Sequence, residues 1–393
     1  MIETLIAGGG IGGLAAALAA TRAGCRVRLF EQSAQWSEAG AGIQLGPNAS
    51  RLLRDWGLEQ ALAKVAASPE QLVVRSATNG AQLAALRLGS SFSKRYGAPY
   101  LTVHRADLHE LLVQGATAVG ADLQLARRIT QMDQSQTVVR LQLEHGGEVA
   151  GDLLVGADGV WSQVRKRLLR DAAAQPTGHL AYRAVLSQAG LPLRLRSQDI
   201  SVWLGPRLHV VAYPVRQGEW LNLVAVVEGY RDDSAQDWDL EAAGVDLHAA
   251  LGTVCADLQA LVHAPELWRL WSLHERAPLR SARQMASGRV ALLGDAAHPM
   301  RPYLAQGAAM ALEDSAELAR MLAMVGERGI DVPTALRRYA LARWQRCARV
   351  QRRAERNGRV FHATGLLRWG RDVSLRLLGE RLLDMPWLYR ELR

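Results

Sequence analysis

Glycines near the N-terminus have the spacing of a phosphate-binding turn. Gly8, Gly10 and Gly13 form a GxGxxG pattern. The first glycine permits a tight turn, the second lets the backbone approach a pyrophosphate, and the third lets a helix pack against a strand. Glu31 follows 18 residues after Gly13, where an acidic side chain accepts hydrogen bonds from ribose hydroxyls. These residues predict binding of a dinucleotide with free ribose hydroxyls, either FAD or NAD.

The segments around this turn have the order strand, helix, strand. Residues Ile2–Ala7 are an apolar run typical of a buried strand. An alanine-rich helix is expected over Leu14–Ala23, ended by Gly24, and Arg26–Glu31 alternates like a second strand. Backbone N–H groups and the positive end of the helix dipole would then face the phosphates. A glycine turn packed without a ligand is the alternative, and the strand, the helix and Glu31 together disfavour it.

The middle of the chain changes to β-like segments separated by turn residues. Gly205-Pro206 and Gln217-Gly218 separate three of them, as hairpin turns would. Neighbouring strands after a βαβ start indicate a separate sheet domain. The expected strands are His179–Ser187, Ile200–Leu204, Leu208–Val215 and Trp220–Glu228.

Composition places the chain among ordinary globular proteins. It has 393 residues, 49% of them hydrophobic and 22% charged, which excludes a disordered or fibrous protein. Three cysteines (Cys25, Cys255 and Cys347) lie far apart without a CxxC pair. A disulfide framework, a zinc site and a redox dithiol therefore lack support, no metal is expected, and a reducing cytoplasm fits best.

The net charge of +9 is concentrated at the C-terminus. From Arg337 onward there are 15 arginines and five acidic residues. One interpretation is solvated helix faces around an apolar stripe; the other is a surface for an anionic membrane or nucleic acid. We favour the first, because Trp344, Val350, Val360, Phe361 and Leu366 alternate with the arginines as core-facing residues would. No nucleic-acid partner and no stable membrane insertion are expected.

Five motifs, in order, resemble those of the single-component flavin-dependent aromatic hydroxylases, the group that includes para-hydroxybenzoate, salicylate and 3-hydroxybenzoate hydroxylases. The resemblance covers nearly the whole chain and is more specific than any one motif. The motifs are Gly8–Gly13 with Glu31, the stretch GAGIQLGPN at 40–48, His104-Arg105-Ala-Asp-Leu108, Gly156-Ala-Asp-Gly159 with Arg165, and GDAAHP at 294–299 continuing to Gln306-Gly307.

The resemblance implies an α/β fold: a Rossmann-like FAD-binding domain, an interleaved β-sheet substrate domain and C-terminal helices. We expect the FAD-binding domain in residues 1–75, 100–175 and 276–335. The substrate sheet should take residues 76–99 and 176–275, and the helical region should take residues 336–393.

The resemblance also implies roles for residues around the cofactor. Arg105 would contact the ribityl or pyrophosphate part of FAD, and Asp158 belongs to a motif linked to both FAD and NAD(P)H. Asp295 would bond the ribityl or ribose hydroxyls, which agrees with its place after the expected strand Val290–Leu293, since open α/β sheets bind ligands at the carboxyl ends of strands. Pro299 would shape the edge of the flavin.

A helix expected from Gln306-Gly307 to about Met324 would direct the N–H groups of Gly307 and Ala308 at the flavin pyrimidine oxygen, where reduced flavin carries negative charge. The alternative is a glycine needed only for packing. Gln306 would lie beside the flavin ring and bond the substrate, and Gln44 would reach the flavin or the pocket, with polar surface residues as the alternative. His298 is expected to be structural rather than a base.

The segment 208–215 supplies two of the three predicted catalytic residues, and Gln306 is the third. On a strand, His209, Val211 and Tyr213 share one face, with the backbones of the outer two about 13 Å apart. The HxxxYP spacing also occurs in salicylate and 3-hydroxybenzoate hydroxylases, so we expect His209 to accept the proton of a phenol and Tyr213 to orient the substrate. A histidine and a tyrosine capping an ordinary sheet are the alternative.

The substrate carboxylate has no clear partner in the sequence. Arg183 and Arg207 are both candidates, and the spacing selects neither. Many related sequences have an apolar residue where Arg301 stands, so substrate identity does not follow from the resemblance.

The expected activity is that of an FAD-dependent monooxygenase. One GxGxxG and no CxxC indicate a protein that holds FAD and meets NADH or NADPH only transiently. By the resemblance, O2 adds at flavin C4a and the hydroperoxide hydroxylates a small phenolic or heteroaromatic acid. The alternatives are a larger quinolone, antibiotic or quinone-precursor substrate, and a non-catalytic flavin-binding interaction protein. Oligomeric state, a homodimer included, stays open.

Overall fold

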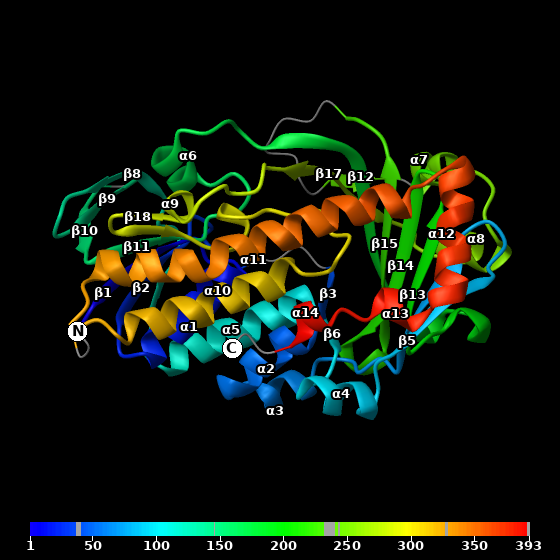
Figure 1. Cartoon of the computed structure of the whole chain (residues 1–393), viewed down its shortest axis with the longest axis horizontal. Helices are drawn as coiled ribbons and strands as arrows, with labels where there is room; N and C mark the ends of the chain where they lie inside the picture. The colour runs from blue at the N-terminus through cyan, green and yellow to red at the C-terminus, as the bar shows by residue number, and fades with distance from the viewer. Residues whose placement is uncertain (37–40, 145, 232–239, 243, 327–328, 391–393) are drawn as a thin grey trace.

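The structure is a computed structural model that describes residues 1–36, 41–144, 146–231, 240–242, 244–326 and 329–390. Gly40, the first residue of the second motif, lies outside the described residues. Two large sheets lie at opposite ends of an elongated molecule, and one long helix runs between them (Figure 1). Mixed helices and sheets confirm the predicted α/β class.

The first sheet is six-stranded and carries the glycine turn. Its central strand β1 (Glu3–Ala7) pairs in parallel with β2 and with β11, as the expected strand–helix–strand start requires. The order is β18 (Ala286–Ser287), β19 (Val290–Leu292), β11 (Leu153–Gly156), β1, β2 (Arg26–Phe30) and β7 (Asp122–Gln124). Two smaller sheets contain β10 (Glu148–Gly151), β9 (Val139–Leu143) and β8 (Ile129–Gln134), and β3 (Gly42–Leu45) with β6 (Leu101–His104).

Helix α1 (Ile11–Arg22) begins three residues before the expected start at Leu14. Its small side chains are buried on nearly every face, because α5 (Arg105–Ala118) and α10 (Gly307–Leu322) both pack against it. Gly12 and Gly13 therefore lie inside the helix, and its N-terminus is placed directly at the turn. Helices α6 (Gln163–Leu169) and α9 (Ala282–Met285) contact this sheet, whereas α2 (Pro47–Asp55) packs against α10 and α3 (Glu59–Ala63) against α5.

The second sheet is eight-stranded and includes the strands expected in the middle of the chain. The antiparallel pairs β13–β14 and β14–β15 confirm both predicted hairpins. Strand β4, most of which lies before the expected start of the substrate domain at residue 76, also pairs with β13 of this sheet. The order is β16 (Leu240–Ala242), β17 (Trp268–Glu275), β12 (Gln175–Ser187), β15 (Trp220–Glu228), β14 (Leu208–Val215), β13 (Ile200–Gly205), β4 (Gln71–Ser76) and β5 (Gln82–Arg87). Helices α4 (Ser90–Tyr96), α7 (Gly244–Leu251) and α8 (Ala256–His263) accompany it.

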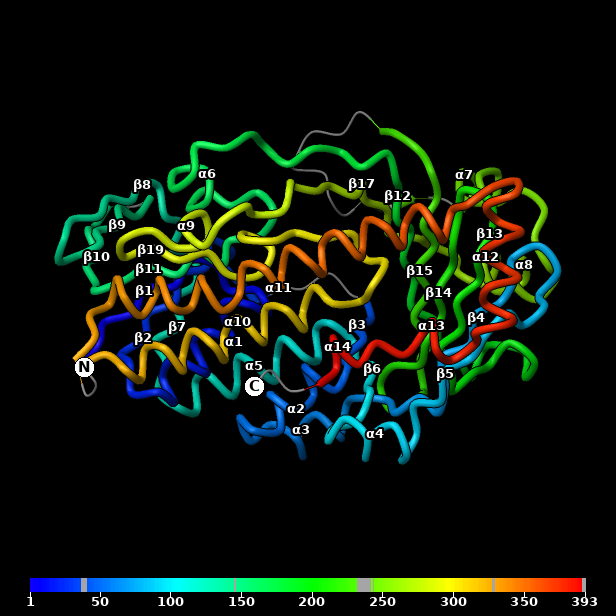
Figure 2. Tube along the Cα trace, viewed as in Figure 1, coloured from blue at the N-terminus to red at the C-terminus, as the bar shows by residue number. Residues whose placement is uncertain are grey.

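The C-terminal region begins with α11 (Val332–Phe361), which extends from the first sheet to the second (Figure 2). The expectation of core-facing residues here is confirmed at Val350, which is buried. It was wrong at Val360 and Leu366, which are 43% and 87% exposed. Leu366 lies in the first turn of α12, after α11 has ended, so the period of the long helix no longer sets its direction. The last helices are α12 (Gly365–Leu378), α13 (Glu380–Leu383) and α14 (Pro386–Tyr389).

None of the described helices is both long and apolar enough to cross a membrane.

Candidate active site

The glycine turn lies between β1 and α1 in a conformation that excludes side chains. Gly8 has φ +103°, and a Cβ there would lie 2.5 Å from the carbonyl oxygen of Ala157. A Cβ on Gly13 would overlap the carbonyl oxygen of Gly8. The side chain of His109 on α5 contacts the Gly9 carbonyl oxygen at 2.7 Å, which fixes the turn from the other side. Gly10 is the N-cap residue of α1. The first backbone N–H groups of this helix therefore face the turn and have no side-chain cap.

Glu31 follows β2 and stands beside the turn, as the sequence predicted. Its carboxylate accepts hydrogen bonds from the backbone N–H of Gly9 at 2.7 Å and of Ser33 at 2.8 Å. A carboxylate has about four lone-pair positions, so capacity remains for ribose hydroxyls. Gly8, Gly9, Gly10 and Glu31 line a cavity of about 1040 Å³.

Arg105 and Asp158 also line this larger cavity. Arg105 is the first residue of α5 and faces the smaller cavity as well, so it stands where the two spaces meet. The carboxylate of Asp158 accepts hydrogen bonds from the Ser162 hydroxyl and from the N–H groups of Gln163 and Val164. Burial raises the pKa of Asp158 despite these donors. Asp158 therefore fixes the N-terminus of α6, which forms part of the wall of the larger cavity.

The second cavity has a volume of about 290 Å³ and lies between the two sheets. On the side of the first sheet it is lined by Asp295, Gly307 and Ala308, and by Gln44 on β3. Asp295 is exposed and follows β19, at the carboxyl end of a strand as expected. A Cβ on Gly307 would meet no atom within 4 Å among the described residues. Neighbouring packing therefore does not require a glycine here, and the N-terminus of α10 is open to a ligand.

The wall on the side of the second sheet is formed by β14, β15 and β12. His209, Val211 and Tyr213 all line it, which confirms that they share one face. Val224 and Val226 of β15 stand beside them, paired with Val211 and His209. This wall is apolar between two polar ends, which suits an aromatic ring with a polar group at each end.

The two titratable groups that β14 contributes to this wall are kept neutral. Burial, followed by the nearby His362 and His179, lowers the pKa of His209 well below its ordinary value. Burial raises the pKa of Tyr213. A neutral imidazole accepts protons and a neutral phenol donates a hydrogen bond, so His209 and Tyr213 have the protonation states that their predicted roles require.

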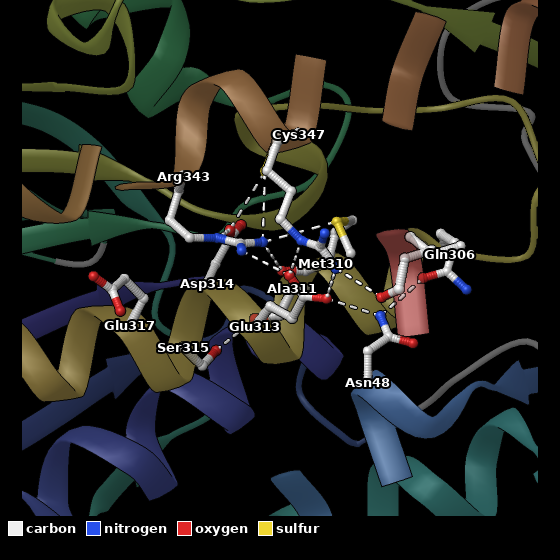
Figure 3. Close-up of polar contacts among 12 residues, drawn as sticks. Asn48, Gln306, Met310, Ala311, Glu313, Asp314, Ser315, Glu317, Arg343 and Cys347 are labelled. Atoms are coloured by element: carbon white, nitrogen blue, oxygen red, sulfur yellow. Dashed lines mark hydrogen bonds and ion pairs between the residues drawn. The ribbon is translucent and has the colours of Figure 1, made fainter. Parts of the chain in front are cut away.

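Gln306 is the N-cap residue of α10 and is 2% exposed. Its Oε1 accepts a hydrogen bond from Asn48 Nδ2 at 3.0 Å, and the same Nδ2 donates to Glu313 Oε1 at 2.8 Å (Figure 3). Because the Glu313 carboxylate can only accept, Asn48 must present its NH2 group, and Gln306 must present its oxygen to Asn48. The Nε2 group of Gln306, a residue that lines the smaller cavity, is buried and has no hydrogen-bond partner among the described residues.

Buried ion pairs hold this arrangement in place. Arg343 on α11 bonds Glu313 and Asp314 of α10, each at 2.7 Å, and Arg346 bonds Glu313 at 2.6 Å (Figure 3). Burial alone would raise the pKa of Glu313, but Arg343 and Arg346 outweigh it and the net shift is downward. The ionised Glu313 is thus held by two arginines of α11. Through Asn48 it determines which amide atom of Gln306 is the acceptor and which is the donor.

The residues present fit FAD. The turn at Gly8 and Gly13 excludes side chains, so its backbone can approach a pyrophosphate. Glu31 lines the larger cavity, and the open N-terminus of α10 lines the smaller one. Arg105 belongs to both cavities, so one extended ligand can occupy them together.

Comparison with known proteins supports the same assignment. Residues 1–354 match the FAD binding domain family. A 3-hydroxybenzoate 6-hydroxylase of Polaromonas naphthalenivorans is 37% identical over 99% of this chain and 96% of its own length. A 6-hydroxynicotinate 3-monooxygenase of Bordetella bronchiseptica is 37% identical over 88% of this chain and 89% of its own. The chain belongs to the flavin-dependent aromatic hydroxylases of this family. A solved salicylate hydroxylase substrate complex superimposes with a TM-score of 0.83, 25% identity, and coverage of 99% and 95% of the two chains.

In this flavin-dependent hydroxylase, Pro299 was expected to shape the edge of the flavin. Pro299 is buried and does not line either cavity; its carbonyl oxygen accepts a hydrogen bond from Gln351. Met300 and Pro302 line the smaller cavity instead. The chain turns after Pro299, so the side chains that follow it face inward and shape the wall.

The structure distinguishes the two candidate arginines for the substrate carboxylate. Arg183 of β12 lines the smaller cavity, with its guanidinium stacked 3.0 Å from the centroid of the Trp271 ring. Arg207 has a 72% exposed side chain in the turn before β14 and pairs with Glu228 at 3.6 Å. Arg301, the departure from the family pattern, is held by Glu275 through two hydrogen bonds. Arg183 is thus the arginine of the three that lines the cavity.

His298 has the structural place expected of it, because it is buried and bonds Asp314 at 2.5 Å. Gln44 lines the smaller cavity and accepts a hydrogen bond from the Tyr100 hydroxyl.

Sequence reasoning missed Asn48 and Glu313, and the partner of His209. That partner is His362, whose Nε2 lies 2.8 Å from His209 Nδ1. The pairs are separated by 258, 265 and 153 positions, so no local pattern connects them.

Proposed function

We propose that this enzyme hydroxylates a small phenolic or heteroaromatic acid, using bound FAD, O2 and NADH or NADPH. The observation that carries the proposal is the 290 Å³ cavity. It brings the open N-terminus of α10 and Asp295 to one side and His209, Tyr213 and Arg183 to the other. When bound, FAD supplies reducing equivalents and activates dioxygen; the protein supplies placement and proton transfer.

Residues of the substrate wall have distinct roles in this proposal. Val211 and Val224 pack against one face of the ring, and Arg183 binds the carboxylate. His209 takes the proton of the ring hydroxyl, which raises the electron density of the ring. The Nε2 group of Gln306 donates a hydrogen bond to an anionic oxygen of the bound acid.

The cavity size favours a single-ring substrate. Pockets for small molecules range from about 300 to about 1,000 Å³, and the cavity is at the lower end even before a flavin ring takes part of it. The names of two relatives, 3-hydroxybenzoate 6-hydroxylase and 6-hydroxynicotinate 3-monooxygenase, describe enzymes of one-ring acids with a ring hydroxyl. We therefore place larger quinolone, antibiotic or quinone-precursor substrates second.

We further propose that the nicotinamide cofactor binds only transiently, because the sequence has one GxGxxG turn and the larger cavity is built around it. The three cysteines are free, which agrees with a reducing cytoplasm. Whether the enzyme is a homodimer stays open in this proposal.

A substrate panel tests the proposal. The purified holoenzyme is mixed with NADH or NADPH and with 3-hydroxybenzoate, salicylate, 6-hydroxynicotinate, benzoate or a larger two-ring phenol, and the products are identified by mass spectrometry. At least one hydroxylated acid should stimulate NAD(P)H oxidation and give a ring-hydroxylated product, whereas benzoate should not be hydroxylated. Stimulation by larger two-ring phenols alone would favour the second candidate, and no stimulation by any compound would contradict both.

A further inference from the structure

His209 is backed by a second buried histidine, which follows the end of α11. His362 is the C-cap residue of that helix and is 5% exposed, and its Nε2 lies 2.8 Å from Nδ1 of His209. The two rings share an aromatic enclosure with Tyr303 and Phe361. Because Nδ1 of His209 is engaged, Nε2 is the ring nitrogen left for a substrate in the cavity.

Polar atoms continue from His362 to the protein surface. The second ring nitrogen of His362, Nδ1, is buried without a hydrogen-bond partner among the described residues, and so is Nδ1 of His179. A ring nitrogen of His179, a ring nitrogen of His362 and a carboxylate oxygen of Glu228 all lie within 4.8 Å of one another. The Glu228 side chain is 46% exposed. A series of proton-binding groups on one face of the sheet therefore connects the substrate cavity with solvent.

A phenol proton cannot stay on His209. A phenol has an ordinary pKa near ~10 and an imidazole near ~6.5, and burial lowers the pKa of His209 further. Transfer to His209 alone is therefore unfavourable, and the phenolate persists only if the proton moves on.

We propose that His362 is a proton-relay residue that passes the substrate proton from His209 to the surface through His179 and Glu228. This inference rests on the proposed function. The phenol O–H bond breaks and its proton binds Nε2 of His209, while the proton on Nδ1 of His209 moves to Nε2 of His362. The proton on Nδ1 of His362 then leaves toward His179, Glu228 and water. One proton enters and one leaves, no electrons are transferred, and the phenolate remains in the cavity.

The groups around His362 lower its affinity for a proton, as a relay residue requires. Burial, followed by His179, Arg371 and Arg301, lowers the pKa of His362 to about 3. Tyr303 faces the same enclosure, and burial raises its pKa, so that it stays neutral. The C-terminal carbonyl groups of α11 favour positive charge beside His362 while the proton passes.

The test uses holoenzyme carrying His362→Phe, which keeps an aromatic ring without nitrogens, and His362→Gln, which still bonds His209 but cannot relay a proton. His263→Phe on the exposed end of α8 is the matched control. Formation of the hydroxylated product is measured from about pH 6 to about pH 10, across the ionisation of the phenol, and bound FAD is checked by its absorbance. Should His362→Phe fail to retain FAD, His362→Gln carries the test.

At neutral pH, we expect both His362 variants to form product at least ~10-fold more slowly than the wild type, with little change in KM. Their rate should rise with pH and approach the wild-type rate as the substrate phenol ionises in solution. A wild-type pH profile would overturn the relay, and so would a loss that is equal at every pH, because that is the signature of a structural defect. If the wild type itself forms no hydroxylated product, the proposed function fails and the relay fails with it.

Discussion

Asn48 Nδ2 donates a hydrogen bond to Gln306 Oε1 at 3.0 Å, across 258 positions of sequence. The same Nδ2 binds the ionised Glu313, so the orientation of both amides is determined by a carboxylate that does not touch the cavity. The site therefore presents an N–H donor at the start of α10. An anionic substrate suits this donor, because a hydrogen bond to a charged group contributes about 1.5–3 kcal/mol.

Gln306→Glu tests this polarity. The variant places a second acceptor where the wild type has a donor, so we expect KM for the aromatic acid to rise by about 10- to 100-fold, in line with the loss of one charge-assisted hydrogen bond. Steady-state kinetics with the preferred acid measures it. Gln259→Glu, the same change on the exposed face of α8, should have no effect. An unchanged KM in Gln306→Glu would show that its amide does not face the substrate.

Arg183→Met and Arg207→Met form a matched pair for the substrate carboxylate. Arg183 lines the cavity and Arg207 is on the surface, so only Arg183→Met should raise KM, by about 10-fold or more. The difference should disappear with a substrate analogue in which an amide replaces the carboxylate. Equal effects of the two substitutions would count against Arg183 as the carboxylate ligand.

His209→Gln removes the proposed base while keeping a polar side chain. General-base catalysis contributes about 10²- to 10⁴-fold, so turnover should fall by about 100-fold, with FAD binding retained. The measurement is kcat for product formation across pH, and His263→Gln on α8 is the control. Unchanged turnover with an unchanged pH profile would remove this role from His209.

Arg343→Met tests the buried ion pairs between α10 and α11. Removing Arg343 leaves Glu313 with Arg346 as its one charged partner among the described residues. It also removes one of the two charged partners of Asp314, and His298 is the other. Breaking a buried pair from one side costs about 3–5 kcal/mol, and urea unfolding of the holoenzyme should show it. Arg352→Met, an exposed arginine of the same helix, should change the free energy of unfolding by less than about 0.5 kcal/mol. Similar losses in both variants would mean that the network adds no stability of its own.

The same network predicts how stability depends on pH. Burial opposes ionisation of Asp314, but His298 and Arg343 outweigh it and lower its pKa to about 2. A carboxyl whose pKa is lower in the folded state stabilises the fold above its unfolded pKa of ~3.9 and loses that contribution as pH falls. The free energy of unfolding should therefore decrease between about pH 4 and about pH 2, with a smaller slope in Asp314→Asn. An equal slope in both proteins would assign the acid sensitivity to other groups.

Local patterns predicted the parts of the site that lie within one element. The βαβ start was readable because strands, glycines and Glu31 follow one another in the chain, and β14 was readable because His209, Val211 and Tyr213 repeat with the period of a strand. Asn48 and His362 were not readable, since each reaches its partner through packing between elements far apart in sequence. The role of Pro299 at the flavin edge stays a prediction; Met300 and Pro302 line the smaller cavity and Pro299 does not, because a motif gives the order of residues but not the direction of each side chain.

The proposal that a flavin-dependent ring hydroxylation occurs in the cavity lined by His209, Gln306 and Gly307 has a direct test. The holoenzyme is incubated with the preferred phenolic acid, NADH or NADPH and isotopically labelled dioxygen, and the product is analysed by mass spectrometry. We predict a hydroxylated acid with one labelled oxygen atom, formed at about one product per NAD(P)H consumed. Hydrogen peroxide as the sole product, or an acid that carries no label, would contradict the account.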